Sequence, residues 1–148
     1  MDRSVTDDGV PPEVSRKLEL AHTTATLGLF AVWFYQGLVP KVLMVDQGEL
    51  DVWIHFGLST QQATVVTVVG GVLEMIFAIL LLVFRNRRWP FVITILAMAG
   101  LLAGVLRVDP AIAGAAYNPV GVNIAMIALA IVALVSMPDR PTTDHPRE

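Results

Sequence analysis

Four long apolar runs constrain the fold of this chain more than any other feature of its sequence. In chain order they are Ala21–Val45, Ala63–Phe84, Trp89–Leu106 and Val120–Met137. A helix needs about 20 mainly apolar residues to cross the hydrocarbon core of a bilayer, with a range of roughly 17 to 25, and all four runs fall within that range. Together they fill more than half of the chain and leave no polar face for water. They therefore predict an all-α integral membrane protein, a bundle of four transmembrane helices, rather than the core helices of a soluble domain.

The composition agrees with this prediction and excludes several kinds of chemistry. Hydrophobic residues make up 55% of the chain and charged residues only 16%, whereas a soluble domain has about 25% charged residues. The net charge of −3 offers no basic face, so we expect no nucleic acid partner. The absence of cysteine excludes thiol chemistry and cysteine-ligated metals. Because the three histidines, His22, His55 and His145, lie far apart in the sequence, we also expect no metal site.

Capping residues mark the ends of the predicted helices. Ser59 and Gln62 have the spacing of a capping box before the second run. Asn118 and Pro119 have the order of an N-cap and a first helical residue before the fourth run. The loop of residues 46–58 mixes apolar and acidic residues, which is typical of a short helix at the membrane interface.

The distribution of charge predicts the orientation in the membrane. The basic residues at one set of span ends are Arg16, Lys17, Arg85, Arg87, Arg88 and Arg140. The other ends carry only Lys41 and Arg107, among Asp46, Glu49, Asp51 and Asp109. Since basic residues favour the cytoplasmic side, both termini are predicted to be cytoplasmic. Polar tails, residues 1–17 and 138–148, would then flank a membrane domain of residues 18–137.

Glu74 is the most informative polar residue of the apolar runs. It lies about three helical turns into the second run, which places it about 16 Å deep, close to the bilayer midplane. On a regular helix it shares a face with Thr67, Gly70 and Ala78, and small residues let neighbouring helices approach. We therefore expect Glu74 to point into the bundle and to have a partner there. Two interpretations stay open: a functional carboxyl, or a structural one that fastens helices together.

The third run offers one candidate donor for Glu74. Arg107 falls on one helical face with Ala97, Gly100 and Gly104, and the two glycines form a GxxxG pair that favours close helix packing. Arg107 would then lean toward the bundle. The alternative is that its side chain extends to the outer head groups.

The first run contains a second group of polar residues around a proline. Gln36 and Lys41 lie about 140° apart on a straight helix, so they can line one cleft only if Pro40 opens the turn between them. Irregular backbone at this depth is tolerated where it borders protein or a wet cavity. Alternatively, Lys41 extends outward to the membrane surface.

These residues predict one ligand site in the outer half of the bundle. Asn118 is either a helix cap or a site residue, and Asn123, one turn further in, needs partners. The predicted ligand-binding residues are Gln36, Lys41, Arg107, Asn118 and Asn123, with Glu74 beneath them. Such a polar pocket, open to the outside and floored by a carboxyl, is typical of a small-molecule site.

Several of these residues also carry a family resemblance. The segments that match are Trp33-Phe34-Tyr35-Gln36-Gly37-Leu38-Val39-Pro40-Lys41, Glu49-Leu50, Gly71 with Glu74, and Tyr117-Asn118-Pro119 with Asn123. Between Ala21 and Met137 the chain resembles the DoxX-like family of small bacterial membrane proteins. The resemblance implies a four-helix bundle in the bacterial cytoplasmic membrane. The family takes its name from a subunit of a thiosulfate:quinone oxidoreductase, which implies a quinone as one cofactor to consider. Gln36 stands where many relatives have histidine, so a proton-transfer role does not carry over to this position.

Two functions follow from these observations. The first is a membrane subunit of a redox assembly that binds a quinone-like or lipid ligand, with Gln36, Lys41 and Asn123 hydrogen-bonding it and Glu74 handling a proton. Because the chain has no haem ligand pair, flavin motif or thiol, a redox partner protein would have to carry the electrons. The alternative is a scaffold or transport-accessory bundle without enzymatic activity, whose buried polar residues only fix helix packing. Whether the chain is itself an enzyme is left open.

Overall fold

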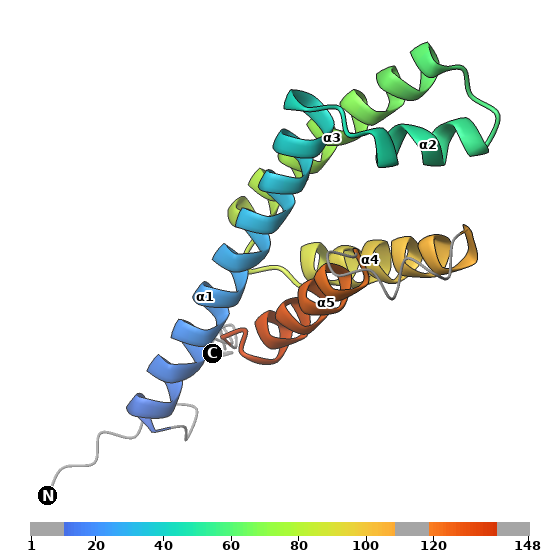
Figure 1. Ribbon diagram of the computed structural model, residues 1–148. Coiled ribbons are helices and arrows are strands. Elements are labelled where there is room, and N and C mark those ends of the chain that lie inside the picture. Colours follow the sequence, from blue (N-terminus) through green and yellow to red (C-terminus); the bar gives the residue numbers. More distant parts are fainter. Residues whose placement is uncertain (1–10, 109–118, 139–148) are drawn as a thin grey trace, which may run out of the picture.

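The computed structural model describes residues 11–108 and 119–138, and within these ranges the regular structure is entirely helical. The elements are α1 (Pro12–Gln36), its π-helical continuation η1 (Gly37–Leu43), α2 (Gln47–His55), α3 (Thr60–Val83), α4 (Trp89–Val108) and α5 (Pro119–Val135). Figure 1 shows α1 as the longest rod, with α3 beside it and α2 at one end. The predicted all-α class is confirmed, and a helix lies in each of the four apolar runs.

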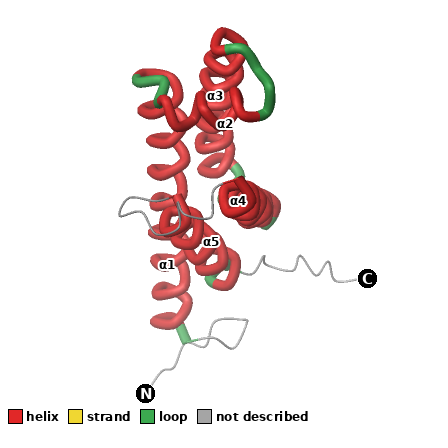
Figure 2. Tube along the Cα trace, turned by 45° about the vertical axis from the view of Figure 1, so that its right-hand side comes forward, coloured by secondary structure: helices red, strands yellow, loops and turns green. Residues whose placement is uncertain are grey.

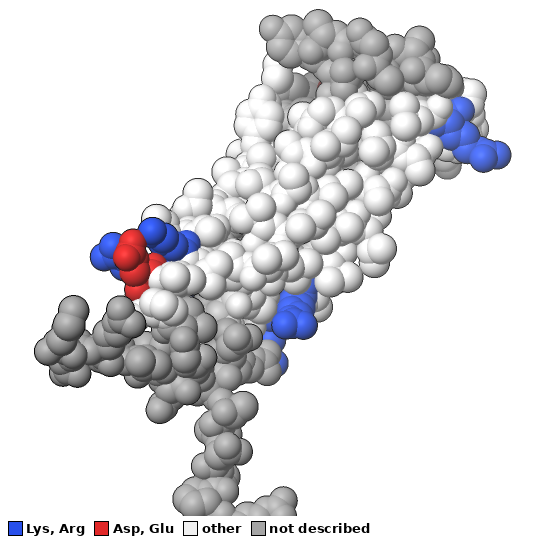
Figure 3. All heavy atoms as spheres, turned by 90° about the horizontal axis from the view of Figure 1, so that it is seen from below, with Lys and Arg blue, Asp and Glu red and all other residues white. Residues whose placement is uncertain are grey.

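Two of the helices are long and apolar enough to cross a membrane. These are the continuous helix Pro12–Leu43 and α3, whereas the apolar parts of α4 and α5, Trp89–Gly104 and Pro119–Val135, are shorter. The outer face of α3 exposes large apolar side chains such as Val65, Ile76 and Ile79, which are about half exposed. Figure 3 shows charged side chains at the ends of one face and a broad uncharged band between them. Such a surface is suited to contact with lipid.

The helices begin where the capping residues predict. In the capping box of α3, Ser59 Oγ accepts from the Gln62 backbone N–H (3.4 Å), and Gln62 Oε1 accepts from the Ser59 N–H (3.0 Å). Pro119 is the first residue of α5, as predicted, while Asn118 lies outside the described residues. The short helix expected in the loop of residues 46–58 is α2. Its N-cap is Asp46, whose side chain accepts from the Gly48 N–H at 2.9 Å.

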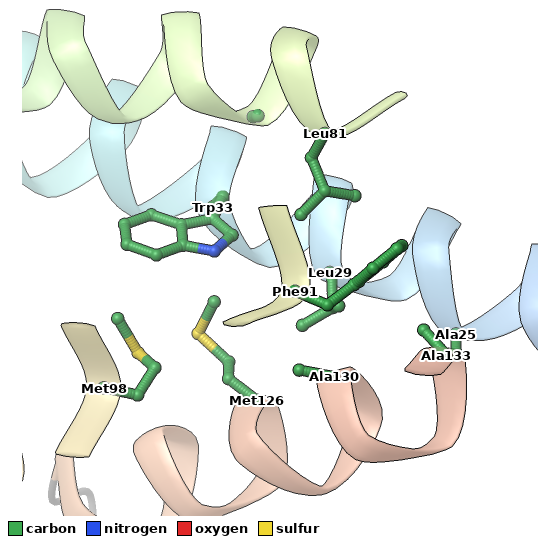
Figure 4. Packing of buried hydrophobic residues seen from close by; sticks show 10 residues of the cluster. Ala25, Leu29, Trp33, Leu81, Phe91, Met98, Met126, Ala130 and Ala133 are labelled. Atoms are coloured by element: carbon green, nitrogen blue, oxygen red, sulfur yellow. The ribbon is translucent and has the colours of Figure 1, made fainter. Parts of the chain in front are cut away.

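The helices pack as two pairs that are joined through α1. Helix α3 packs along α1 and η1, and α5 packs against both α1 and α4, whereas α3 and α4 touch only slightly. In Figure 2, α5 lies between α1 and α4. The buried core collects Leu29 of α1, Leu81 of α3 and Phe91 of α4, and Figure 4 shows these side chains converging with Met126 of α5. The α3–α4 side of the bundle is therefore less closely packed than the others.

A buried histidine joins three elements at one end of the bundle. His22 of α1 is 3% exposed. Its Nδ1 lies 2.8 Å from the carbonyl oxygen of Ala133 on α5, and its Nε2 lies 3.0 Å from the carbonyl oxygen of Arg85 in the α3–α4 loop. These contacts bring the first half of α1, the α3–α4 loop and the end of α5 to one end, which we call the loop end. The opposite end, which carries α2, is called the α2 end.

The closest approach of two helices occurs between η1 and α3. A Cβ atom placed on Gly71 would lie 2.5 Å from the Gly37 carbonyl oxygen, and one placed on Gly37 would lie 2.5 Å from the Gly71 carbonyl oxygen. No atom lies within 4 Å of a Cβ placed on Gly70, Gly100 or Gly104. The close packing predicted at the GxxxG pair of α4 is therefore wrong, because both of its glycines are exposed. On α3, Gly71 rather than Gly70 makes the helix contact.

Candidate functional site

Pro40 opens the helix at the position where the site is built. Because proline has no N–H, the carbonyl of Gln36 lacks its α-helical donor. The following turn is wider: the Met44 N–H donates to the Val39 carbonyl at 3.0 Å, and the Asp46 N–H donates to the Pro40 carbonyl at 2.8 Å. The turn at Pro40 is thus open, which was the condition for Gln36 and Lys41 to line one cleft. Single π-helical turns inside α-helices are frequent at functional sites.

The wide turn directs Lys41 toward α3. Its Nζ lies 2.6 Å from Glu74 Oε1 and 3.7 Å from Glu49 Oε1 on α2. The side chains of Lys41 and Glu74 are only 16% and 18% exposed, while that of Glu49 is 38% exposed. We call these three residues the Lys41 cluster. One ammonium serves two carboxylates, so the fully ionised cluster carries one negative charge.

The partner of Glu74 is thus a lysine from η1 and not the arginine of α4. Arg107 is exposed, so its expected role as the donor for Glu74 is wrong. The reason is that α4 diverges from α3, whereas η1 lies against it at Gly71. Of the two interpretations left open for Lys41, the structure selects the inward one. A buried pair of this kind fixes the two helices, because removing one partner leaves an uncompensated charge at a cost of about 3–5 kcal/mol.

Two buried polar side-chain atoms of α3 have no hydrogen-bond partner in the described part of the chain. They are Glu74 Oε2 and Thr67 Oγ1, on the face of α3 that also carries Gly71. Most buried polar atoms in proteins are paired, and an exception calls for an explanation such as a function, a water molecule or a ligand. The carboxylate of Glu74 is therefore half satisfied: Lys41 holds one oxygen, and the other is buried without a partner in the described ranges.

Glu74 also borders an apolar groove between α3 and α4, with a volume of about 460 Å³. The residues that line this α3–α4 groove are Trp33, Leu73, Glu74, Phe77, Ile93, Leu96, Ala97, Gly100 and Leu101. Glu74 is the only ionisable residue among them. The indole N–H of Trp33 donates to Thr94 Oγ1 at 3.3 Å, and its ring meets that of Phe77 edge-on at 5.1 Å. The groove therefore combines aromatic and aliphatic walls with one carboxylate.

The other predicted site residues lie elsewhere. Gln36 lines a different groove, of about 430 Å³, which runs past Pro40 and Asp46 at the α2 end. Asn123 is 7% exposed on α5, which packs against α1 and α4. Asn118 lies outside the described residues. The structure thus brings together Lys41 and Glu74 and distributes Gln36, Arg107 and Asn123 over other faces.

Three residues of the site did not emerge from the sequence. Glu49 was one acidic loop residue among several, although Asp46 and Glu49 have the spacing of a capping box and so place Glu49 in the first turn of a helix. Thr67 was assigned only to a small-residue face, and Trp33 only to a family motif. Their roles in the site depend on how α1, η1, α2, α3 and α4 pack together, and no local pattern in the sequence specifies that packing.

Comparison with known proteins gives one match. A family model described as the DoxX-like family matches residues 30–131. That range contains the whole Lys41 cluster and every residue that lines the α3–α4 groove. No curated protein and no solved structure matches the chain.

Proposed function

The chain belongs to the DoxX-like family of membrane proteins, and from this premise we propose that it is a membrane subunit that binds a small apolar ligand, quinone-like or lipid, for a redox assembly. The ligand would occupy the α3–α4 groove with its polar head near Glu74. A partner protein would supply the electron carriers, because the sequence has no motif for binding one.

One observation carries this proposal: a half-satisfied carboxylate borders an otherwise apolar groove. Glu74 is held by Lys41 through one oxygen, and its second oxygen has no partner among the described residues. Small-molecule sites usually combine apolar walls with a few placed polar groups. Ionisable residues within membrane helices mark ligand or proton sites by default. The groove has both properties.

We also propose a location and an orientation for the subunit. It would span the bacterial cytoplasmic membrane four times, with the loop end in the cytoplasm. Arg85, Arg87 and Arg88 lie in the α3–α4 loop at this end, and Arg16 and Lys17 lie in the first turns of α1. The α2 end carries the acidic residues Asp46, Glu49 and Asp51 instead. This charge distribution supports the orientation.

The second candidate function is a scaffold in which the Lys41 cluster only fixes helix packing. The observation in its favour is the position of the ion pair beside the Gly37–Gly71 contact, where η1 and α3 are closest. In this case the groove would hold only ordinary acyl chains.

Blocking the groove distinguishes the two candidates. The protein in nanodiscs is titrated with decylubiquinone while tryptophan fluorescence is recorded, because Trp33 lines the groove and a bound quinone quenches a ring that it touches. Gly100→Leu fills the groove, and Gly104→Leu is the matched control, since it lies one turn further along α4, outside the groove, and neither position has an atom within 4 Å of a new Cβ.

The ligand-site proposal predicts saturable quenching that Gly100→Leu abolishes and Gly104→Leu retains. In Trp33→Phe, the saturable part should disappear and leave only collisional quenching of Trp53 and Trp89. Equal, unsaturable quenching in all variants would contradict the ligand site and leave the scaffold.

A further inference from the structure

We propose that the loop between α3 and α4 binds the phosphate group of an anionic phospholipid, and that one acyl chain of this lipid lies in the α3–α4 groove. The head-group site is separate from the Lys41 cluster. Arg85, the first arginine of the loop, follows Glu74 by eleven residues, or about 16 Å at the rise of a helix. The inference therefore goes beyond the proposed function and does not depend on it.

The first argument is the charge of the loop. Three of the five residues between α3 and α4 are arginines, namely Arg85, Arg87 and Arg88. All three are exposed, and none forms a salt bridge within residues 11–108 and 119–138. Neither the last turn of α3 nor the first turn of α4 contains an acidic residue. The loop therefore presents three positive charges that the described part of the chain does not neutralise.

The chemistry of arginine favours phosphate as the anion. A guanidinium group is planar and can donate two parallel hydrogen bonds to the oxygens of one phosphate. Each basic residue beside a membrane surface strengthens the attraction to anionic lipids by about fivefold. Three such residues in one loop therefore predict a strong preference for a lipid with net negative charge over a zwitterionic one.

The backbone of the loop is held in place by contacts that leave the arginine side chains exposed. The carbonyl oxygen of Arg85 lies 3.0 Å from Nε2 of the buried His22, and the Arg87 N–H donates to the Phe84 carbonyl at 2.8 Å. Binding of a phosphate then has to order only the side chains. Because a preformed site loses less conformational entropy on binding, these contacts favour the lipid-bound state.

Aromatic residues on both sides of the arginines indicate the depth of the loop in the membrane. Phe84 precedes them and Trp89 follows them, with exposed fractions of 39% and 40% and ring centroids 5.4 Å apart. Tryptophan is enriched at the level of the lipid head groups, because its ring is apolar and its N–H is polar. The neighbouring guanidinium groups are therefore placed at the level of the phosphates.

The α3–α4 groove supplies a path for an acyl chain of the same lipid. The loop joins the two helices that form the groove, as Figure 1 shows. Ile93 and Leu101, both of which line the groove, follow Arg88 by about 7 Å and about 20 Å along α4. One leaflet contributes about 15 Å to the hydrocarbon core, so a chain whose phosphate lies at the loop reaches most of the groove.

Positive charge and apolar surface thus lie side by side, which suits an amphipathic anion better than free phosphate. The exposed fractions of Ile93 and Leu96 are 43% and 67%, so the apolar wall is open to a lipid from the bilayer. The ligand of the proposed function, with its head near Glu74, would enter the groove by displacing this acyl chain.

The test measures Kd by native mass spectrometry of the full chain in a nonionic detergent. The probes are dioleoyl phosphatidylglycerol, dioleoyl phosphatidylcholine, dihexanoyl phosphatidylglycerol and the soluble sn-glycerol 3-phosphate. Dioleoyl phosphatidylglycerol should bind at least about tenfold more tightly than the phosphatidylcholine with the same chains. Glycerol 3-phosphate carries the phosphate without the chains and should bind most weakly of the anions.

A double substitution tests the head-group site. Arg87→Gln with Arg88→Gln should weaken binding of dioleoyl phosphatidylglycerol by about 25-fold, which is about fivefold for each charge removed. The matched control, Arg16→Gln with Lys17→Gln, removes the same charge from exposed positions on α1 and should change Kd by less than about threefold.

Filling the groove tests the path of the acyl chain. Gly100→Leu should weaken binding of the dioleoyl lipid and leave that of the dihexanoyl lipid unchanged, because the shorter chains end before this position. Gly104→Leu, which lies outside the groove, should affect neither lipid.

Each contrary result overturns a stated part of the inference. Equal binding of phosphatidylglycerol and phosphatidylcholine, or equal losses in the loop and α1 variants, overturns the head-group site and leaves the arginines to another anion, such as an acidic protein segment. Glycerol 3-phosphate binding as tight as lipid binding, or no effect of Gly100→Leu, overturns the acyl-chain path. The proposed function is tested separately, since decylubiquinone does not require the loop arginines.

Discussion

Replacing Gly71 by alanine tests whether η1 and α3 touch through their backbones. The new Cβ would lie 2.5 Å from the Gly37 carbonyl oxygen and 2.7 Å from Lys41 Cβ. Neither atom can rotate away, because one belongs to the backbone and the other is fixed to it. To restore an ordinary contact of 3.4 Å, the two segments must separate by about 0.9 Å.

The expected cost follows from two opposing terms. Inserting a methyl group into a close-packed contact costs about 1–3 kcal/mol. Alanine is a better helix former than glycine by about 1 kcal/mol, which offsets part of this cost. Because the obstruction is rigid, we place the packing term in the upper half of its range. Gly71→Ala should therefore lower the free energy of unfolding by about 1–2 kcal/mol.

The adjacent glycine provides the control. Gly70→Ala adds the same methyl group one residue earlier, where no atom lies within 4 Å, so it should leave stability unchanged or raise it by at most about 1 kcal/mol. Both variants are measured by circular dichroism during unfolding of the protein in mixed micelles with increasing SDS. Equal shifts for the two alanines, or a stabilised Gly71→Ala, would refute the close backbone contact described here.

Three further predictions concern the ion pair, the buried histidine and the π-helical segment. Lys41→Met should lower the free energy of unfolding by about 3–5 kcal/mol, because it leaves the Glu74 carboxylate buried without its cation. The double variant Lys41→Met with Glu74→Leu should recover most of this loss in the same unfolding assay. His22→Ala should cost about 1–3 kcal/mol, because it removes a buried ring whose two nitrogens contact the carbonyl oxygens of Ala133 and Arg85. The exposed Thr24→Ala on the same helix should stay within about 0.5 kcal/mol, and similar values for both would contradict the role of His22. Pro40→Ala restores the missing N–H and should let η1 return to an α-helix. The coupling energy between Lys41 and Glu74, measured by a double-mutant cycle, should then fall toward zero. An unchanged coupling energy would show that proline is not what turns Lys41 inward.

The helices could be predicted from the sequence because their signals are local. The apolar runs give the helical segments, and Ser59 with Gln62 specifies the start of α3 through contacts three residues apart. Pro119 begins α5 for the same kind of reason. The angles between helices depend instead on contacts between distant residues. The GxxxG pair of α4 therefore gave a wrong prediction of close helix packing. The observed close contact joins Gly37 to Gly71, which lie in no recognisable motif.

The site was predicted only in part, for a related reason. The burial of Glu74 and the opening of the turn by Pro40 follow from residue type and depth, and both are observed. The direction in which the opened turn points Lys41 depends on how far η1 unwinds, which residue spacing on a straight helix does not give. Gln36 consequently lines another groove, and Lys41 takes the place expected for Arg107.

The shallow contact between α3 and α4 means that any membrane solute must compete with lipid acyl tails for the α3–α4 groove. Leu73, Ile93 and Leu96 line the groove and remain 59%, 43% and 67% exposed, so in a bilayer acyl tails fill the space whenever nothing else does. Replacing an acyl tail in the groove by another apolar molecule yields little net binding free energy, because the groove and the bilayer are equally apolar. Occupancy of the groove then depends on the mole fraction of the solute in the membrane rather than on its aqueous concentration. The solute reaches the groove by lateral diffusion through the surrounding lipid. Selection among membrane solutes is left almost wholly to one carboxylate.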